Sequence, residues 1–200
     1  MNEHILKGLR GIRPNTTKRT FLQTLELQIK LKGYNNIIIK NVILPYKVRL
    51  KPLNICFFVN YKHYQEAEDL NIATLCEDKL QTLKKDKVLQ NNLIKTYDIF
   101  FCSDTIIRKL PRLIGPEFYK KGKYPVVVRS DDVLTNIIDI EARKIRWKFK
   151  KNNTQNIAIG NESFTDEQLM ENVVCALHSL QGKIESAYMK YTMGPSVKII

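Results

Sequence analysis

The sequence contains little that would place the protein in a membrane or outside the cell. No apolar run approaches the roughly 18 residues that span a bilayer, and runs such as Ile37-Ile38-Ile39 and Val126-Val127-Val128 have the length of a strand. Residues 1–14 lack the hydrophobic core of a secretory signal and include Glu3. These absences argue against a membrane protein and against secretion, although they do not exclude a transit peptide.

Cysteine and histidine are scarce and scattered. The four cysteines lie far apart beside apolar residues, and the three histidines are equally dispersed: Cys56, Cys76, Cys102, Cys175, His4, His63 and His178. A disulfide framework or a zinc site needs such residues in close, regular spacings. We therefore expect reduced and mostly buried thiols, no metal site and a cytosolic location.

Motifs of common catalytic and nucleotide-binding sites are also missing. The sequence has no G-x-G-x-x-G after its first buried strand, no G-x-x-x-x-G-K-[ST] and no G-x-S-x-G. Its carboxylates are scattered among lysines instead of forming pairs that share a proton. We expect no enzyme activity, no cofactor and no small-molecule substrate.

Basic residues, in contrast, are abundant. The 200-residue chain has 33 Lys and Arg against 20 Asp and Glu, which gives a net charge of +13, and 44% of its residues are apolar. That apolar content is enough to bury a core. The self-repulsion of so much positive charge is offset when an anionic partner binds, and phosphate is the usual anion. The composition therefore predicts a globular protein that binds a polyanion.

Both ends of the chain show the alternation of half-buried strands. Residues 25–32 place four aliphatic side chains on one face and polar ones on the other, and residues 141–150 place Trp147 and Phe149 opposite Lys and Arg. Residues 42–50 are a further strand candidate with Pro45 at an edge or bulge, and residues 156–160 are a candidate hairpin partner for 141–150.

Helices and one more strand complete the pattern at the ends. Residues 4–11 have helical spacing, and Thr165 with Gln168 fits a capping box that starts a helix with a buried stripe up to Leu180. Residues 186–194 predict a last strand with Ser186, Lys190 and Thr192 on its polar side. The proline after Gly194 is expected to forbid further pairing.

The middle of the chain has a different texture. Short continuous apolar runs at 55–59, 98–102 and 126–128, with a shorter strand at 72–75, alternate with helical segments at 64–70, 78–95 and 105–110. Strands that alternate with helices are typical of a parallel, Rossmann-like layer. The sequence thus predicts two domains, α+β from the two chain ends and α/β in between.

Charge divides the chain at the same places. Residues 1–51 carry a net charge of +9 and residues 141–200 carry +3, whereas residues 52–140 carry only +1. We therefore expect a discontinuous α+β domain from 1–51 and 141–200 that binds RNA, and an inserted Rossmann-like domain from 52–140.

Several motifs together resemble a known family. They are RTFLQTLELQIKL at 19–31, Tyr97-Asp98 with RLIGP at 112–116, KGKYP at 121–125 and TMGPSV at 192–197. In this order they resemble the large-subunit ribosomal protein of the mobile stalk, the universal L-one family, which eukaryotes call L-ten-a. The region 80–98 is more similar to the eukaryotic form.

The resemblance implies a function as well as a fold. It implies a structural constituent of the large ribosomal subunit that binds the rRNA of the mobile stalk next to the tRNA exit site and assists release of deacylated tRNA. It also implies a surface towards tRNA around Gly115-Pro116 and Gly122. The alternative is an RNA-binding repressor outside the ribosome, which acts on mRNA through the same face.

Site residues follow from the matching positions and from the strand pattern. The rRNA contacts of the family correspond here to Phe21, Thr24, Glu26, Ser186, Thr192, Met193 and Gly194. Lys30 and Lys190 share the polar faces of the two strands. The family commonly has a basic residue before this phenylalanine, where the present sequence has Thr20, and Lys18 or Arg19 can take over its phosphate contact.

Two of these residues have competing interpretations. Glu26 is an acceptor for a base amino or 2′-hydroxyl group, or else a salt-bridge partner that orients a Lys or Arg. Phe21 falls on the core face by strand parity, which favours simple packing unless the strand begins after it.

Overall fold

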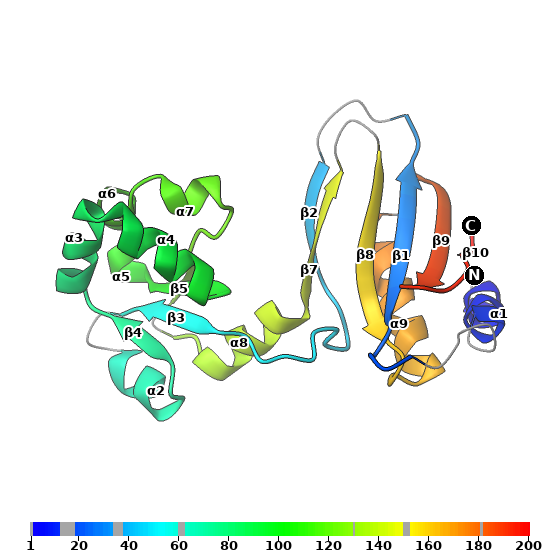
Figure 1. The fold of residues 1–200 in the computed structure, drawn as a ribbon, viewed down its shortest axis with the longest axis horizontal. Helices are drawn as coiled ribbons and strands as arrows, with labels where there is room; N and C mark the ends of the chain where they lie inside the picture. Colours follow the sequence, from blue (N-terminus) through cyan, green and yellow to red (C-terminus); the bar gives the residue numbers. More distant parts are fainter. Residues whose placement is uncertain are drawn as a thin grey trace. The chain divides into compact units, whose positions relative to one another are not determined.

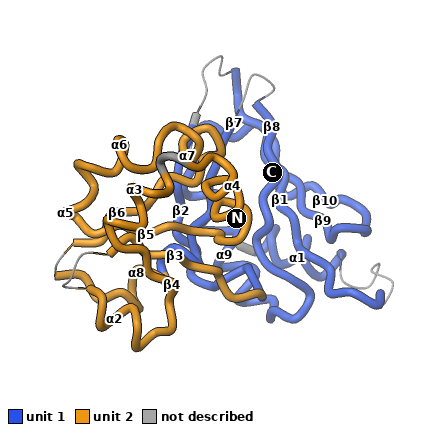
Figure 2. Tube along the Cα trace, turned by 60° about the vertical axis from the view of Figure 1, so that its left-hand side comes forward, with its two compact units in different colours: residues 1–50, 140–200 blue, residues 51–139 orange. Residues whose placement is uncertain are grey.

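The computed structural model describes residues 2–12, 19–33, 38–59, 63–129, 131–149, 153–180 and 182–200. The chain forms two compact units, Met1–Leu50 with Ile140–Ile200 (unit 1) and Lys51–Asp139 (unit 2), as Figure 2 shows. Both boundaries between the units lie one residue earlier than the sequence predicted. The predicted combination of α+β and α/β architecture is confirmed.

Unit 1 is built on an antiparallel sheet in the order β10-β9-β1-β8 (Figure 1). Its strands are β1 (Thr24–Leu31), β8 (Thr154–Asn161), β9 (Ile184–Tyr191) and β10 (Val197–Lys198). The central strand β1 comes from the N-terminal segment, whereas its neighbours β8 and β9 follow the inserted unit. The sheet therefore forms only when the two ends of the chain meet.

One face of this sheet is covered by α9 (Asp166–His178), which Figure 1 shows behind the strands. The predicted capping box is present, since Thr165 and Gln168 exchange side-chain and backbone hydrogen bonds at the start of the helix. The apolar side chains of β1 and the predicted stripe of α9 are buried in one core. Gly160 lets the helix approach β8, because a Cβ there would lie 2.3 Å from Leu169 Cδ2.

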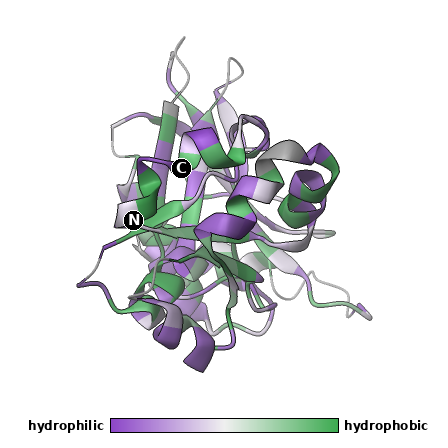
Figure 3. Ribbon diagram, turned by 90° about the vertical axis from the view of Figure 1, so that its left-hand side faces the viewer, coloured by the Kyte–Doolittle hydropathy of each residue, from purple (hydrophilic) through white to green (hydrophobic). Residues whose placement is uncertain are grey.

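Helix α1 (Asn2–Ile12) closes the same core at the other edge. Its Ile5, Leu9 and Ile12 are fully buried, and the helix packs against α9, β9 and β10. In Figure 3 the helices carry hydrophilic and hydrophobic residues side by side, as expected when one face covers a core and the other meets water.

A second, two-stranded antiparallel ribbon in unit 1 joins β2 (Ile38–Ile43) and β7 (Lys144–Phe149). The predicted strand 42–50 was therefore wrong in its range. Pro45 has no N–H to donate to a neighbouring strand, so the strand ends before it and instead comprises Ile38–Ile43. On β7, Trp147 and Phe149 point into the common core and stack at a centroid distance of 5.4 Å.

Strand β8 is not the backbone partner of β7, contrary to the predicted hairpin. It pairs with β1, and a bulge opposite Leu25 and Glu26 adjusts its register. The Gln155 side chain connects the two strands instead, because its amide accepts from Lys148 N and donates to Arg146 O at 3.4 Å. The ribbon β2-β7 thus continues the layer beyond β8 through a side chain.

The chain also resumes pairing after Pro195, which the sequence did not predict. Val197 and Lys198 form β10 opposite Met189 and Tyr188. The proline itself lies in the turn and donates nothing, but the residues after it regain N–H groups and return along β9.

Unit 2 is a parallel sheet in the order β4-β3-β5-β6, as the Rossmann-like pattern predicted. Its strands are β3 (Ile55–Phe58), β4 (Ala73–Leu75), β5 (Ile99–Ser103) and β6 (Val126–Val128). Alternate residues of β3 and β5 enter two separate cores, one on each face. This explains why the strands are continuous apolar runs.

Helices cover both faces of the unit 2 sheet. One core is completed by α3 (Glu77–Lys85), α4 (Lys87–Thr96), α5 (Asp104–Ile107), α6 (Leu110–Ile114) and α7 (Glu117–Lys120), the other by α2 (Tyr64–Asp69) and the start of α8 (Leu134–Arg143). The single helix predicted over 78–95 is interrupted at Asp86. That carboxylate accepts from Val88 N and Leu89 N, so it ends one helix and caps the next.

The cysteines are all free thiols. Cys56 and Cys102 are buried in unit 2, and burial raises the pKa of each thiol to about 12. Cys175 is partly buried, whereas Cys76 is exposed, so only one thiol departs from the expected burial.

Asn172 joins three segments of unit 1 and provides a test of its packing. The buried amide donates to Ile159 O at 2.8 Å and to Tyr46 O at 3.2 Å, and it accepts from Tyr46 N at 3.0 Å. Asn172→Leu keeps the number and branching of the side-chain heavy atoms but leaves these groups without partners, so we expect the free energy of unfolding to fall by about 2–4 kcal/mol.

Urea unfolding followed by the fluorescence of Trp147, the one tryptophan of the chain, reports on unit 1. Asn41→Leu is the matched control, because Asn41 is exposed on β2 and the change should stay within about 0.5 kcal/mol. Equal stabilities of the two variants would contradict the bridging role of Asn172.

Candidate nucleic-acid interface

The face of the unit 1 sheet opposite α9 is polar and open. Rows of side chains cross it from strand to strand, and one row runs from Asn156 through Gln28 and Tyr188 to Lys198. The adjacent rows contain Glu26 beside Lys190, and Thr154, Lys30 and Ser186. Neighbouring strands lie about 4.8 Å apart, so these groups form one continuous surface, which we call the polar face.

Thr24 and Thr192 close one end of the polar face. The Thr192 hydroxyl donates to Thr24 O at 3.1 Å and accepts from Thr24 N at 3.3 Å, while Thr192 N donates to Thr24 O at 3.0 Å. The sequence predicted Thr192 within the last strand, but the residue lies in the turn after β9. Its hydroxyl therefore extends the ladder by one more residue pair and keeps one lone pair for another donor.

Two ion pairs cross the strands of the polar face. Lys190 Nζ lies 3.9 Å from Glu26 Oε2, and Lys30 Nζ lies 2.8 Å from Glu185 Oε1. The Lys190–Glu26 pair is the one expected if Glu26 orients a lysine by a salt bridge. The pair uses Oε2 and leaves the other carboxylate oxygen of Glu26 available. Glu185 reaches this face because β9 has a bulge opposite Lys30 and Leu31, which turns its side chain away from the core side.

Exposed apolar groups gather at the Thr24–Thr192 end of the sheet. Phe21 is 49% exposed and Met193 is 61% exposed, and both lie just outside the paired strands. Of the two interpretations of Phe21, core packing is excluded, because β1 begins three residues later and parity does not extend back to it. Apolar side chains this exposed are suited to contact with a partner.

The remaining predicted residues have simpler surroundings. Arg19 is exposed before β1, and Gly194 N donates to Tyr191 O at 2.8 Å in the turn. Ser186 is half-buried on the polar face. Lys18 lies outside the described residues. Strands β1 and β9 with their flanking turns thus bring together every predicted site residue that the structure describes.

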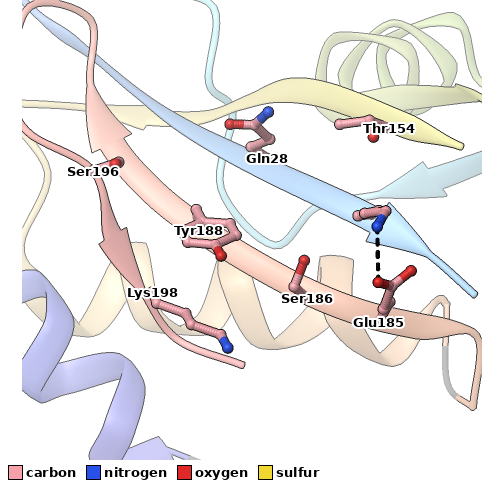
Figure 4. Close-up of a pocket in the computed structure, with 8 residues that line it drawn as sticks. Gln28, Thr154, Glu185, Ser186, Tyr188, Ser196 and Lys198 are labelled. Carbon is pink, nitrogen blue, oxygen red and sulfur yellow. Dashed lines mark hydrogen bonds and ion pairs between the residues drawn. The ribbon is translucent and has the colours of Figure 1, made fainter. Parts of the chain in front are cut away.

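A hollow of about 550 Å³ opens on the polar face (Figure 4). It is lined by Gln28, Lys30, Thr154, Glu185, Ser186, Tyr188, Ser196 and Lys198. Only Lys30 and Ser186 of these were predicted site residues. Parity with Ser186 was a signal for Tyr188, whereas the bulge at Glu185 and the strand β10 that carries Lys198 left no such signal.

Cations flank the polar face on β7. Arg146 and Lys148 are exposed, and they alternate with Trp147 and Phe149, which enter the core shared with β1. Their side chains therefore point to the same side as the polar face. The polar face itself is nearly balanced in charge, with three lysines against two glutamates, so most of the net positive charge of unit 1 lies outside it.

The described residues form neither a metal site nor a membrane-spanning helix. No three His, Cys, Asp or Glu side chains in the described ranges gather closely enough to hold a metal ion. No helix within those ranges combines the length and the apolar character that a bilayer span needs.

Comparison with known proteins assigns the family. The model of the ribosomal protein L1p/L10e family matches residues 14–195, which include most of each segment of unit 1 and all of unit 2. The chain belongs to this family. The match includes both β1 and β9, whose outward side chains form the polar face.

Relatives from plants and animals agree with this assignment. The chain is 33% identical over 193 residues to large ribosomal subunit protein uL1y of Arabidopsis thaliana, covering 91% of this chain and 89% of that protein. It is 32% identical to large ribosomal subunit protein uL1 of Spodoptera frugiperda, covering 91% and 88%. It is 30% identical to large ribosomal subunit protein uL1 of Caenorhabditis elegans, covering 100% and 96%.

The Thr192 hydroxyl provides a test of how β1 and β9 are joined. Thr192→Val removes both of its bonds to Thr24, so we expect the free energy of unfolding to fall by about 1 kcal/mol. Thr192→Ser keeps the hydroxyl and should cost less than half of that. Urea unfolding followed by Trp147 fluorescence compares the two variants, and equal destabilisation would show that the hydroxyl does not support the ladder.

Proposed function

We propose that this protein is a structural constituent of the large ribosomal subunit, held there by rRNA that binds the polar face of unit 1. One observation carries the proposal. The residues that the family resemblance assigns to rRNA contacts, on β1, on β9 and in the turns beside them, share one exposed end and face of a sheet. Its relatives carry the name of large ribosomal subunit proteins, which supports the same role.

The chemistry of the polar face suits folded RNA. Hydroxyls of Thr192 and Ser186 and the carboxylate of Glu26 offer donors and acceptors for sugar and phosphate groups, including the 2′-hydroxyl that distinguishes RNA from DNA. A face with nearly balanced charge does not attract phosphate by itself. Specific contacts in the centre and cations at the rim are what a site for a folded RNA needs.

The charge of the two units supports the same division. Unit 1 contains nineteen Lys and Arg against eight Asp and Glu, whereas unit 2 contains fourteen against twelve. Phosphate contacts scale with available cations. The larger net charge of unit 1 therefore favours it as the principal rRNA-binding part.

Finer parts of the proposal rest on the family resemblance. The rRNA is that of the mobile stalk beside the tRNA exit site, and the protein assists release of deacylated tRNA in the cytosolic ribosome. A tRNA contact by unit 2 around Gly115-Pro116 and Gly122 would be weak, since that unit is nearly neutral. The proposed role is binding and structural, not catalytic.

Binding to the large-subunit rRNA stalk fragment over a salt series tests the proposal, with an unrelated RNA duplex of equal length as the reference. We expect tight binding to the stalk fragment that persists at physiological salt and exceeds binding to the duplex. Equal binding to both RNAs that is lost as salt rises would contradict the proposal. It would mean that the net positive charge only binds polyanions nonspecifically.

Variants of the rim separate attraction from recognition. Arg146→Gln removes one cation that can meet a phosphate, so it should reduce the slope of log affinity against log salt by about 0.7 to 0.9 and weaken binding of both RNAs alike. Lys79→Gln in unit 2 is the matched control, because Lys79 is exposed on α3 and no change is expected. An unchanged slope for Arg146→Gln would remove β7 from the interface.

A further inference from the structure

The hollow on the polar face has an exposed aromatic ring within it. Tyr188 is 36% exposed, and its register neighbours are Gln28 on β1 and Lys198 on β10. Figure 4 shows the ring between these two side chains, with Ser196 and Ser186 nearby. An aromatic side chain that stands on a sheet surface, with polar groups around it, is a platform on which a flat group can stack.

The polar groups of the hollow have unused hydrogen-bonding capacity. Within the described residues, the side chains of Gln28, Tyr188, Ser196 and Lys198 make no hydrogen bond or ion pair with another residue. The Gln28 amide offers both donors and an acceptor, the two hydroxyls offer both, and Lys198 offers three donors. Such a set matches a ligand that presents both kinds of group along one edge.

Charge argues against a site for phosphate alone. The hollow is lined by two lysines, Lys30 and Lys198, and by one carboxylate, that of Glu185, which already accepts from Lys30 at 2.8 Å. A phosphate in the hollow would meet this carboxylate, while the aromatic ring would gain nothing from it. A nucleotide fits better, because its base has a face for Tyr188 and an edge for Gln28, and its phosphate reaches Lys198 at the rim.

We propose that the hollow receives one unpaired nucleotide of the bound rRNA, with its base stacked on Tyr188, its edge bonded to Gln28 and its phosphate on Lys198. This inference rests on the proposed rRNA binding by the polar face. Proteins read RNA mainly through unpaired bases stacked on aromatic side chains, and a volume of about 550 Å³ lies within the range of about 300–1,000 Å³ usual for ligand sites. Tyr188 would thus select RNA that can present such a base.

Substitution of Tyr188 tests the stacking. Tyr188→Leu should raise the dissociation constant for the stalk fragment by about 5- to 100-fold, since stacking on one base has this weight, and it should leave the salt slope unchanged. Tyr188→Phe keeps the ring and should bind within about 3-fold of the unchanged chain. Lys198→Met should instead reduce the salt slope by about 0.7 to 0.9.

Two controls accompany these variants. Tyr119→Leu changes an exposed tyrosine of unit 2, whose side chain is 55% exposed, and should leave binding unchanged. A fully paired RNA duplex of equal length has no base to offer, so Tyr188→Leu should bind it like the unchanged chain. Urea unfolding with Trp147 fluorescence checks that unit 1 stays folded, which is expected because Tyr188 lies outside the core.

A fluorescent base identifies the nucleotide. 2-Aminopurine placed in turn at each unpaired position of the stalk fragment should be quenched at one position by the unchanged chain and by Tyr188→Phe, but not by Tyr188→Leu. Stalk binding of a folded Tyr188→Leu variant equal to that of the unchanged chain would overturn the inference, as would equal weakening of stalk and duplex binding. If the unchanged chain does not distinguish stalk from duplex, the proposed function itself fails.

Discussion

Pairing of β1 with β8 and β9 is the constraint on which unit 1 depends. β1 is the central strand of its sheet, yet both neighbours lie more than 120 residues later in the chain. Contacts of such long sequence separation carry a high entropic cost of closure, which the buried apolar face of β1 and the capped helix α9 must offset. The polar face exists only as a consequence of this pairing, because its residues alternate with the buried ones.

The same pairing explains why Thr192 and Glu26 lie together. Thr192 bonds to the backbone at Thr24, and Lys190 pairs with Glu26 in the next row. Under the proposed function, a residue in this region both supports the fold and contacts RNA, so a loss of RNA binding in a variant can have either cause. Variants that keep the hydroxyl, the ring or the charge are therefore needed to separate the two parts.

Specificity and attraction have different origins on this surface. Hydroxyls, amides and the Tyr188 ring occupy the centre, where charge is nearly balanced, while Arg146 and Lys148 flank it on β7. Cations contribute long-range attraction that salt weakens, whereas shaped and stacked contacts do not depend on salt to the same degree. Under the proposed function, this arrangement would let a protein with a net charge of +13 prefer one folded RNA over others.

Strict alternation made β1 and its buried face predictable, and Thr165 with Gln168 did the same for the start of α9. The predictions failed where contacts with residues distant in the sequence overrode the local pattern. Parity could not indicate the bulge that turns Glu185 outward, nor the return of the chain as β10 after Pro195.

Phe21 and the residues near Asp86 show how poorly the sequence pattern predicts where a strand or helix begins and ends. Strand parity favoured core packing of Phe21 unless the strand began after it, and β1 does begin later, at Thr24. Asp86 lies inside a helical pattern, but its carboxylate accepts from the amides of Val88 and Leu89 and starts a new helix. The family motifs identified most of the candidate site residues, whereas the hollow and its lining required the strand register.

Oxidative footprinting of the protein tests the central claim most directly. Hydroxyl radicals would label the exposed side chains of Phe21, Tyr188 and Met193, with and without the stalk fragment, and Tyr119 of unit 2 is the internal reference. Binding of rRNA to the polar face predicts strong protection of the first three side chains and little change at Tyr119. Unchanged labelling of Met193 and Tyr188 in the saturated complex would show that the RNA binds elsewhere.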